Sequence, residues 1–470
     1  MTEWLDGSLA DAADAVARGE VSAEELTRAA IARAESLQPT LNTFISLRAE
    51  QAIDQARGVD AARAKGATLT PLTGVPLAHK DMYYRAGEVS TCGADFLKQT
   101  AQDDTAAALQ RLDMAGAIDL GGLNQTEFAV GPLGHNVHHG HIHNPWNPDH
   151  CPGGSSSGSG AATAAGIVFG ALGSDTGGSV RLPAAFCGVV GMKPTLGRVS
   201  RHAMMPLSHS FDCAGPLTRT VRDNARMLAA IAGHDPRDAA ASSRPVDDYE
   251  AACGRTVKGV RIGIPDKFFL ADLDPELEKA LGQAQDVLRE AGAMLVPVTI
   301  PDPAPDNLVW NVIMAAEAAT LHKRWLTAQP ERYAEQVRRR LSVGLYLPAT
   351  RYLEATALRD KALNRFARLV FGQCDMLFGA TVPFAAPGLA ETDIGADAAM
   401  PELILRVSSL TRPANFLGLP AISVPCGFNQ AGLPLAMQLI GQPFDEAGLY
   451  AVAHAYEQAT AWHRRRPSLS

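Results

Sequence analysis

The first 65 residues carry apolar positions at the spacing of amphipathic helices. These positions are Leu9, Ala12, Val16, Val21, Leu26, Ile31 and Leu37, with alanine, glutamate and arginine between them. Ser22 precedes Glu25 by three residues, which is the spacing of a capping box, so a helix is expected from there to about Ser36. The pattern predicts an N-terminal helical segment over residues 1–65 that packs on the core.

Beyond residue 70, short apolar strands alternate with helices. Strands are expected at residues 74–78, 117–120, 168–173, 260–264, 294–300, 376–378, 421–425 and 435–440, and helices at 161–167 and 275–291. Alternation of this kind is typical of α/β proteins with a parallel or mixed sheet.

Changes in composition suggest how the chain is divided. Residues 234–252 read as an exposed loop, and residues 307–370 form a long helical region rich in alanine, leucine and arginine. We therefore expect a catalytic core at 66–235, a helical insertion with the substrate pocket at 236–400, and the C-terminal part of the core at 401–470.

Composition narrows the function classes. A net charge of −8 and a pI near 5.9 offer nucleic acid no electrostatic attraction. Seven scattered cysteines do not make a disulfide framework, which favours a reducing cytoplasm. The acidic start does not resemble a secretory signal, and the absence of a run of 18 apolar residues predicts no membrane span.

The chemistry is concentrated between Gly153 and Pro183. Two clusters rich in glycine and serine stand here, separated by a small-residue apolar segment. Glycines let backbone N–H groups approach a ligand closely, and an oxyanion needs donors of that kind. This pattern predicts the wall of an active site.

A serine nucleophile needs a base. Six histidines lie within residues 134–150, but the sequence reveals no acidic residue placed to orient them. Lys80 follows the apolar residues 75–78, so its side chain is expected to start inside the core. Burial lowers the pKa of a lysine, and a neutral lysine accepts a proton. Lys80 is therefore the candidate base.

Several blocks in this order resemble the amidase signature family of serine hydrolases, which use a Ser–cis-Ser–Lys triad. They are GVPLAHKD at 74–81, NPWN at 144–147, GGSS at 153–156, DTGGSVRLP at 175–183, GMKPT at 191–195, GPLTR at 215–219, and the segments 415–420 and 432–441. The resemblance covers residues 65–235 and 405–445 well and departs at Ser157, where the family often has glycine. It implies a large mixed, mostly parallel twisted sheet covered by helices on both faces, with a helical insertion in the second half.

The resemblance also implies roles for individual residues. Ser179 is the expected nucleophile, Ser155 the bridging serine with a cis peptide bond, and Lys80 the terminal base. The expected oxyanion hole consists of the backbone N–H groups of Thr176, Gly177, Gly178 and Ser179. Gly154, Ser156, Asp175 and Arg181 support the site, with Asp175 accepting bonds from loop N–H groups and Arg181 acting as its buried charge partner.

The implied activity is hydrolysis of the C–N bond of a small to medium carboxamide, such as an aryl amide or a ureide, with no cofactor and no metal. The expected partners are a small-molecule amide and a second copy in a homodimer, with no nucleic acid and no membrane. Two alternatives share the fold: the glutamine-hydrolysing subunit of a tRNA-dependent amidotransferase, and a non-catalytic scaffold.

Two rival interpretations of the motifs remain. Residues 154–158 also satisfy G-x-S-x-G, which would make Ser156 the nucleophile of an α/β-hydrolase. The histidines at 134–150 suit a metal such as zinc, but they lack HExxH or CxxC spacing, which favours a loop at the rim of the site. Residues lining the acyl pocket are expected within 120–150 and 300–400.

Overall fold

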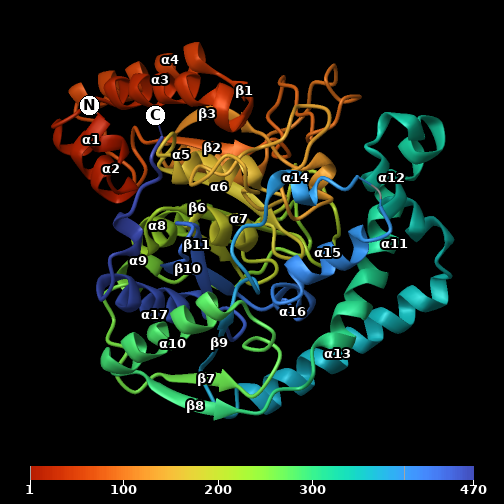
Figure 1. The fold of residues 1–470 in the computed structure, drawn as a ribbon. Helices are drawn as coiled ribbons and strands as arrows, with labels where there is room; N and C mark the ends of the chain where they lie inside the picture. The colour runs from red at the N-terminus through yellow and green to blue at the C-terminus, as the bar shows by residue number, and fades with distance from the viewer. Residues whose placement is uncertain (1, 396, 470) are drawn as a thin grey trace.

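An 11-stranded sheet runs through the molecule, from β1 at the top of Figure 1 to β8 at the bottom. The computed structural model describes residues 2–395 and 397–469. The strands follow the order β1-β3-β2-β4-β6-β5-β10-β11-β9-β7-β8. Their bounds are β1 Phe44–Leu47, β2 Pro76–Lys80, β3 Ile118–Leu123, β4 Gly170–Asp175, β5 Val190–Lys193, β6 Cys213–Thr218, β7 Arg261–Pro265, β8 Met294–Val298, β9 Met376–Ala380, β10 Ala421–Phe428 and β11 Pro434–Gly441.

Helices cover both faces of this sheet, as expected. The pair α6 and α7 packs over β4, β5 and β10, while α8, α10 and α17 pack against β6, β10 and β11. The N-terminal helices lie together at the β1 end of the sheet (Figure 1). The helices are α1 Thr2–Leu5, α2 Leu9–Arg18, α3 Ala23–Leu41, α4 Ala49–Ala64, α5 Ala107–Met114, α6 Ser157–Ala164, α7 Arg181–Cys187, α8 Val221–Ile231, α9 Tyr249–Ala252, α10 Pro275–Glu290, α11 Ala304–Ala328, α12 Glu335–Ser342, α13 Ala349–Val370, α14 Leu389–Thr392, α15 Met400–Ser408, α16 Arg412–Phe416 and α17 Glu446–Gln458.

The mixed sheet is confirmed, but the expectation that it is mostly parallel needs correction. Parallel pairing joins β2 to β3 and β4, and β7 to β8 and β9. The other neighbours are antiparallel. The reason is local: β10 and β11 are adjacent strands joined by a short turn, which only antiparallel strands allow.

Most predicted elements lie within a few residues of their observed positions. The capping box at the start of α3 is present, with the Ser22 hydroxyl accepting the Glu25 N–H and the Glu25 carboxylate accepting the Ser22 N–H. The short edge strand β1 interrupts the segment expected to be helical, because Phe44–Leu47 pairs with β3. Pairing of that kind depends on a distant part of the chain.

The helical insertion of the second half is confirmed. Helices α11, α12 and α13 follow β8 and precede β9, and they project from the sheet on the right of Figure 1. Helix α11 also packs against α16. The insertion also reaches the C-terminal end of β4, because Trp310 of α11 donates to the carbonyl of Thr176, the residue after that strand.

Two expectations from composition can be compared directly with the structure. All seven cysteines are buried free thiols. Among the described helices, none has both the length and the apolar character needed to cross a membrane.

Candidate active site

Lys80 ends the central strand β2 and is fully buried. Its Nζ donates to the Ser155 hydroxyl at 2.7 Å and to the Ser174 hydroxyl at 2.9 Å. Burial lowers the pKa of Lys80 to about 7, although the charges of Asp212 and Asp175 oppose this shift. The lysine therefore divides its population between charged and neutral forms near neutral pH.

The GGSS block brings Ser155 to this lysine. The Gly154–Ser155 peptide bond is cis, as the resemblance implies. The carbonyl of Ser155 accepts the Thr126 N–H at 3.2 Å, and its side chain is buried. The block is also tied to the second motif, because the Ser156 N–H donates to the Ser179 carbonyl at 3.3 Å.

Ser179 lies in the turn between β4 and α7. Its side chain is partly exposed, whereas Ser155 and Ser156 are fully buried. Ser179 lines a small cavity together with Thr176 and Gly177. Of the three serines in the two blocks, it is the one that a substrate can reach.

A buried ion pair fixes the shape of this turn. Arg181 Nε lies 3.1 Å from Asp175 Oδ2, and both side chains are inaccessible to solvent. Asn415 also donates to Asp175, at 2.8 Å. Burial alone would raise the pKa of Asp175, but the Arg181 charge and these hydrogen bonds lower it to about 2. A carboxylate held in this way is a structural acceptor, which is the role expected for it.

The hydrogen bonds correct one part of the expected oxyanion hole. The Gly178 N–H donates to Asp175 Oδ1 at 2.7 Å, so it is not free for a substrate. Within residues 2–395 and 397–469, no hydrogen bond engages the N–H groups of Thr176, Gly177 or Ser179. Gly178 still has a reason to be glycine, because its φ is +129° and a Cβ would overlap the Thr411 side chain.

Ser156 does not fit the role of an exposed nucleophile. Its hydroxyl accepts the Ser174 N–H at 3.1 Å and lies 3.3 Å from the Ser174 carbonyl. These bonds point the side chain into the protein, where they join the GGSS block to the end of β4. The nucleophile-elbow interpretation would need that hydroxyl free.

Sequence reasoning missed several residues of the site. Ser174 was not singled out, although it stands one position before the DTGGS block and contacts Lys80. Trp310 of α11 donates from Nε1 to the Thr176 carbonyl at 3.1 Å. Two arginines, Arg340 and Arg412, also line the cavity. Trp310 was already among the aromatic residues of 307–352 considered for a hydrophobic pocket. A lone arginine in a helical region carries no recognisable spacing, so no sequence signal marked Arg340 or Arg412.

The histidines correct another expectation, because several do face acidic groups. His79 Nδ1 lies 3.1 Å from Asp119 Oδ1, and His138 Nε2 lies 3.2 Å from Glu127 Oε1. In the part of the chain that the structure describes, none of the histidine rings is hydrogen-bonded to Ser179. Geometry therefore favours lysine over histidine as the base.

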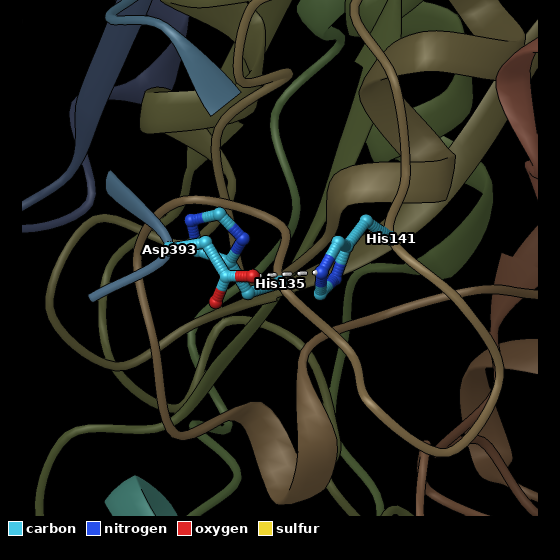
Figure 2. Close-up of side chains that lie close together, drawn as sticks. All are labelled: His135, His141 and Asp393. Carbon is cyan, nitrogen blue, oxygen red and sulfur yellow. Dashed lines mark hydrogen bonds and ion pairs between the residues drawn. The ribbon is translucent and has the colours of Figure 1, made fainter. Parts of the chain in front are cut away.

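One histidine group offers atoms that could hold a metal ion. Nitrogen atoms of His135 and His141 and an oxygen of Asp393 lie within 4.8 Å of one another (Figure 2). The His141 Nδ1 accepts the Asn136 N–H at 3.1 Å, so the ring proton belongs on Nε2, which faces Asp393 at 3.3 Å. A metal at that nitrogen would require the other tautomer and the loss of the Asn136 bond. The observed contacts instead fasten the 134–143 loop to the residue after α14.

Comparison with known proteins gives consistent matches. The family model named Amidase matches residues 25–450. A glutamyl-tRNA(Gln) amidotransferase subunit of Moorella thermoacetica is 40% identical over 479 residues, covering 97% of each chain. A solved structure from a vestigial protein complex linked to the origins of an s-triazine catabolic enzyme has a TM-score of 0.90 at 32% identity, covering 96% of this chain and 98% of that one. A bacterial aryl acylamidase of the amidase signature family has a TM-score of 0.88 at 26% identity, covering 97% and 96%.

These relatives correct the expected partners. The sequence led us to expect a homodimer acting by itself on a small-molecule amide, without nucleic acid. The curated relatives are instead named as one subunit of an enzyme of glutamyl-tRNA(Gln). Net charge and composition describe the single chain, so they carry no information about partner subunits.

Proposed function

Because the chain belongs to the amidase signature family, we propose that it hydrolyses a carboxamide through an acyl-enzyme on Ser179. The observation that carries this proposal is the 2.7 Å contact between Lys80 Nζ and the Ser155 hydroxyl in a site that lowers the pKa of the lysine to about 7. A base with a pKa near the working pH is effective in proton transfer.

The reaction begins with a proton relay. Neutral Lys80 has one lone pair and two protons; one proton binds the Ser174 hydroxyl, and the lone pair takes the proton of Ser155. Ser155 in turn takes the proton of Ser179. The Ser179 oxygen then forms a bond to the amide carbon, and the carbonyl oxygen becomes an oxyanion.

The backbone stabilises this oxyanion. We assign the role to the N–H groups of Thr176, Gly177 and Ser179, with Gly178 excluded by its bond to Asp175. Loss of one such donor typically lowers the rate by about 10²–10³-fold. Collapse of the intermediate breaks the C–N bond, and the proton held by Lys80 returns through Ser155 to the leaving nitrogen. A water molecule then cleaves the acyl-enzyme, using the same relay.

We further propose that the chain is the amide-hydrolysing component of a multi-subunit amidotransferase, to which it delivers ammonia. This proposal rests on identity of about 40% to the curated amidotransferase subunits along almost the whole length of both chains. The net charge of −8 is consistent with leaving tRNA contact to partner chains.

A serine trap tests the nucleophile without knowledge of the substrate. The intact mass is measured after treatment with a fluorophosphonate for the wild type, Ser179→Ala and the matched control Ser156→Ala. We expect one adduct on the wild type and on Ser156→Ala, and none on Ser179→Ala. An adduct that survives Ser179→Ala but disappears in Ser156→Ala would refute the assignment.

A second experiment tests the proposed place in a complex. Ammonia release from a primary amide is measured for the chain alone and together with the other subunits of a bacterial glutamyl-tRNA(Gln) amidotransferase. We expect the added subunits to bind the chain and to stimulate ammonia release at least tenfold. Full activity of the chain alone, with no binding and no stimulation, would overturn the place in a complex and leave hydrolysis by Ser179 standing.

A further inference from the structure

Two arginines from different helices meet in the cavity beside Ser179. Arg340 belongs to α12 of the insertion, and Arg412 is the first residue of α16. Both line the cavity that also contains Ser179, Thr176 and Gly177. They lie near enough for the charge of Arg340 to lower the pKa of Arg412.

The Arg412 guanidinium is held in place but is not neutralised. Its residue is only 3% exposed, and its plane lies over the Trp310 ring, 4.5 Å from the ring centre. Nη1 makes a long 3.4 Å bond to Asn311, and Nε is buried without a hydrogen-bond partner among the described residues. Stacking on an aromatic ring orients a guanidinium and leaves its edge free for a planar anion.

Arg340 has even fewer partners. In the described part of the chain its buried Nη1 has no hydrogen bond, although the rest of the side chain is half-buried. Across residues 2–395 and 397–469, neither Arg340 nor Arg412 forms an ion pair. Burial lowers the pKa of Arg340 to about 10 and contributes to lowering that of Arg412 to about 9, so both remain charged at neutral pH.

One buried and one half-buried positive charge without a counter-charge are unfavourable for the free protein. Buried charges in proteins are paired, and an unpaired one is a place where an anion is missing. The remaining walls do not supply that anion, because they consist of apolar groups, glycines and the hydroxyls of Ser179, Thr176 and Ser408. Among the described residues that line this cavity, none is an aspartate or a glutamate.

The cavity is also small. Its volume is about 40 Å³, which is room for only a few water molecules. A cavity of this size favours a short acyl group over a bulky aromatic one.

We propose that Arg340 and Arg412 together bind a carboxylate at the far end of the acyl group, so that the site selects short acidic amides that carry no ammonium group. A carboxylate matches the forked donors of a guanidinium, and two such donors supply the counter-charge that this cavity lacks. The inference rests on the proposed hydrolysis by Ser179 and deepens it by naming the class of amide.

The lack of an acidic residue in the described cavity wall indicates that amides carrying an ammonium group bind poorly. A free α-amino acid amide such as glutamine brings an ammonium group next to its carboxylate. In this cavity that ammonium would meet two positive charges and no carboxylate to accept it. The monoamide of a dicarboxylic acid has the same reacting amide and the same carboxylate without this penalty.

A substrate series on the wild-type protein tests both the preference for a carboxylate and the exclusion of an ammonium group. Ammonia release is measured for succinamate, glutaramate, glutamine and the uncharged pentanamide, with the chain in whichever form, alone or with the added subunits, is more active. We expect the better acidic monoamide to exceed glutamine at least tenfold and pentanamide at least a hundredfold in kcat/KM. Glutamine or pentanamide matching the acidic monoamides would overturn the inference.

Variants separate recognition from a structural role. Arg340→Gln and Arg412→Gln are expected to lower kcat/KM for the acidic monoamide at least tenfold more than they lower kcat/KM for pentanamide, with the difference appearing in KM. Arg338→Gln, on the same helix but outside the cavity, is the matched control and should change neither. An equal loss for both substrates would mean that the arginines only support the fold, and would overturn the inference.

Fluorophosphonate labelling of Ser179 shows separately whether the proposed nucleophile works, whatever amide the site prefers. Labelled Ser179 without any preference for acidic amides would reject the arginine assignment alone. Unlabelled Ser179 would reject the hydrolysis on which both proposals rest.

Discussion

Lys80 Nζ donates a hydrogen bond of 2.9 Å to the Ser174 hydroxyl and another of 2.7 Å to the Ser155 hydroxyl. A buried lysine with one hydrogen-bond partner rather than two could rotate its amine. With Ser174 fixed at the end of β4, the direction in which Lys80 accepts a proton is set by the sheet.

Removal of that acceptor should affect the rate without removing the base. We expect Ser174→Ala to lower kcat about tenfold, because the amine of Lys80 loses one of the two bonds that orient it. The hydroxyl also stabilises the charged lysine, so its loss should lower the pKa further and shift the pH profile toward lower pH. The pH dependence of kcat measures both effects, and an unchanged profile with unchanged kcat would contradict them.

The activity should follow the titration of Lys80. Since burial lowers its pKa to about 7, kcat/KM should rise as the pH passes from about 6 to 8. Lys80→Met should remove this rise and lower the rate at least a thousandfold. A Lys80→Met enzyme that keeps the wild-type pH profile would show that another group is the base.

Lys80 should lower the free energy of unfolding at pH values below 10.5, the ordinary pKa of a lysine. Its pKa is depressed in the folded protein, so the unfolded chain binds more protons between pH 7 and about 10.5, and stability due to this group rises with pH in that interval. At pH 7 we expect Lys80→Met to increase the free energy of unfolding by a few kcal/mol. Urea unfolding at pH 7 and 9.5 tests this, and a Lys80→Met protein less stable than the wild type at pH 7 would contradict it.

The Asp175–Arg181 pair should be costly to break. Asp175→Asn leaves the buried Arg181 without its counter-charge, for which we expect a loss of about 3–5 kcal/mol in the free energy of unfolding. The matched control is Asp375→Asn, which breaks the exposed pair with Arg261 and should cost under about 1 kcal/mol. Similar losses for the two variants, measured in urea, would show that burial does not decide the effect.

This pair also predicts a pH limit. The pKa of Asp175 is lowered to about 2 in the folded protein, so its contribution to stability is present above pH 4 and is lost as the pH falls toward 2. The Asp175→Asn protein should lack this acid-dependent part when unfolding is followed between pH 5 and 2. An equally steep loss in the variant would assign the acid sensitivity to other carboxylates.

The sequence predicted which residues belong to the site better than it predicted the hydrogen bonds between them. Lys80, Ser155 and Ser179 stood in ordered motif blocks, and the structure does place Lys80 against Ser155 across 75 positions of the chain. The Gly178 N–H was assigned to the oxyanion hole by the resemblance to the amidase signature family. Its bond to Asp175 depends on a side-chain orientation that no motif encodes.

The remaining errors have a similar origin. Strand β1 and the antiparallel strands β5 and β6 are defined by their pairing with distant strands, which local periodicity cannot show. Arg340 sits in a helix of ordinary amphipathic composition, and only the tertiary fold brings it to the cavity. Groups that follow from a local motif were therefore predictable, and groups delivered by long-range packing were not.

The insertion between β8 and β9 supplies Trp310 and Arg340, and α16 supplies Arg412, whereas the proposed nucleophile Ser179 comes from the turn before α7 and the proposed base Lys80 from β2. In the proposed mechanism, bond cleavage and choice of acyl group therefore depend on separate stretches of one chain. Such a division would let an evolving lineage change the amides that it accepts by altering the inserted helices and α16, while the serines and the lysine are inherited unchanged.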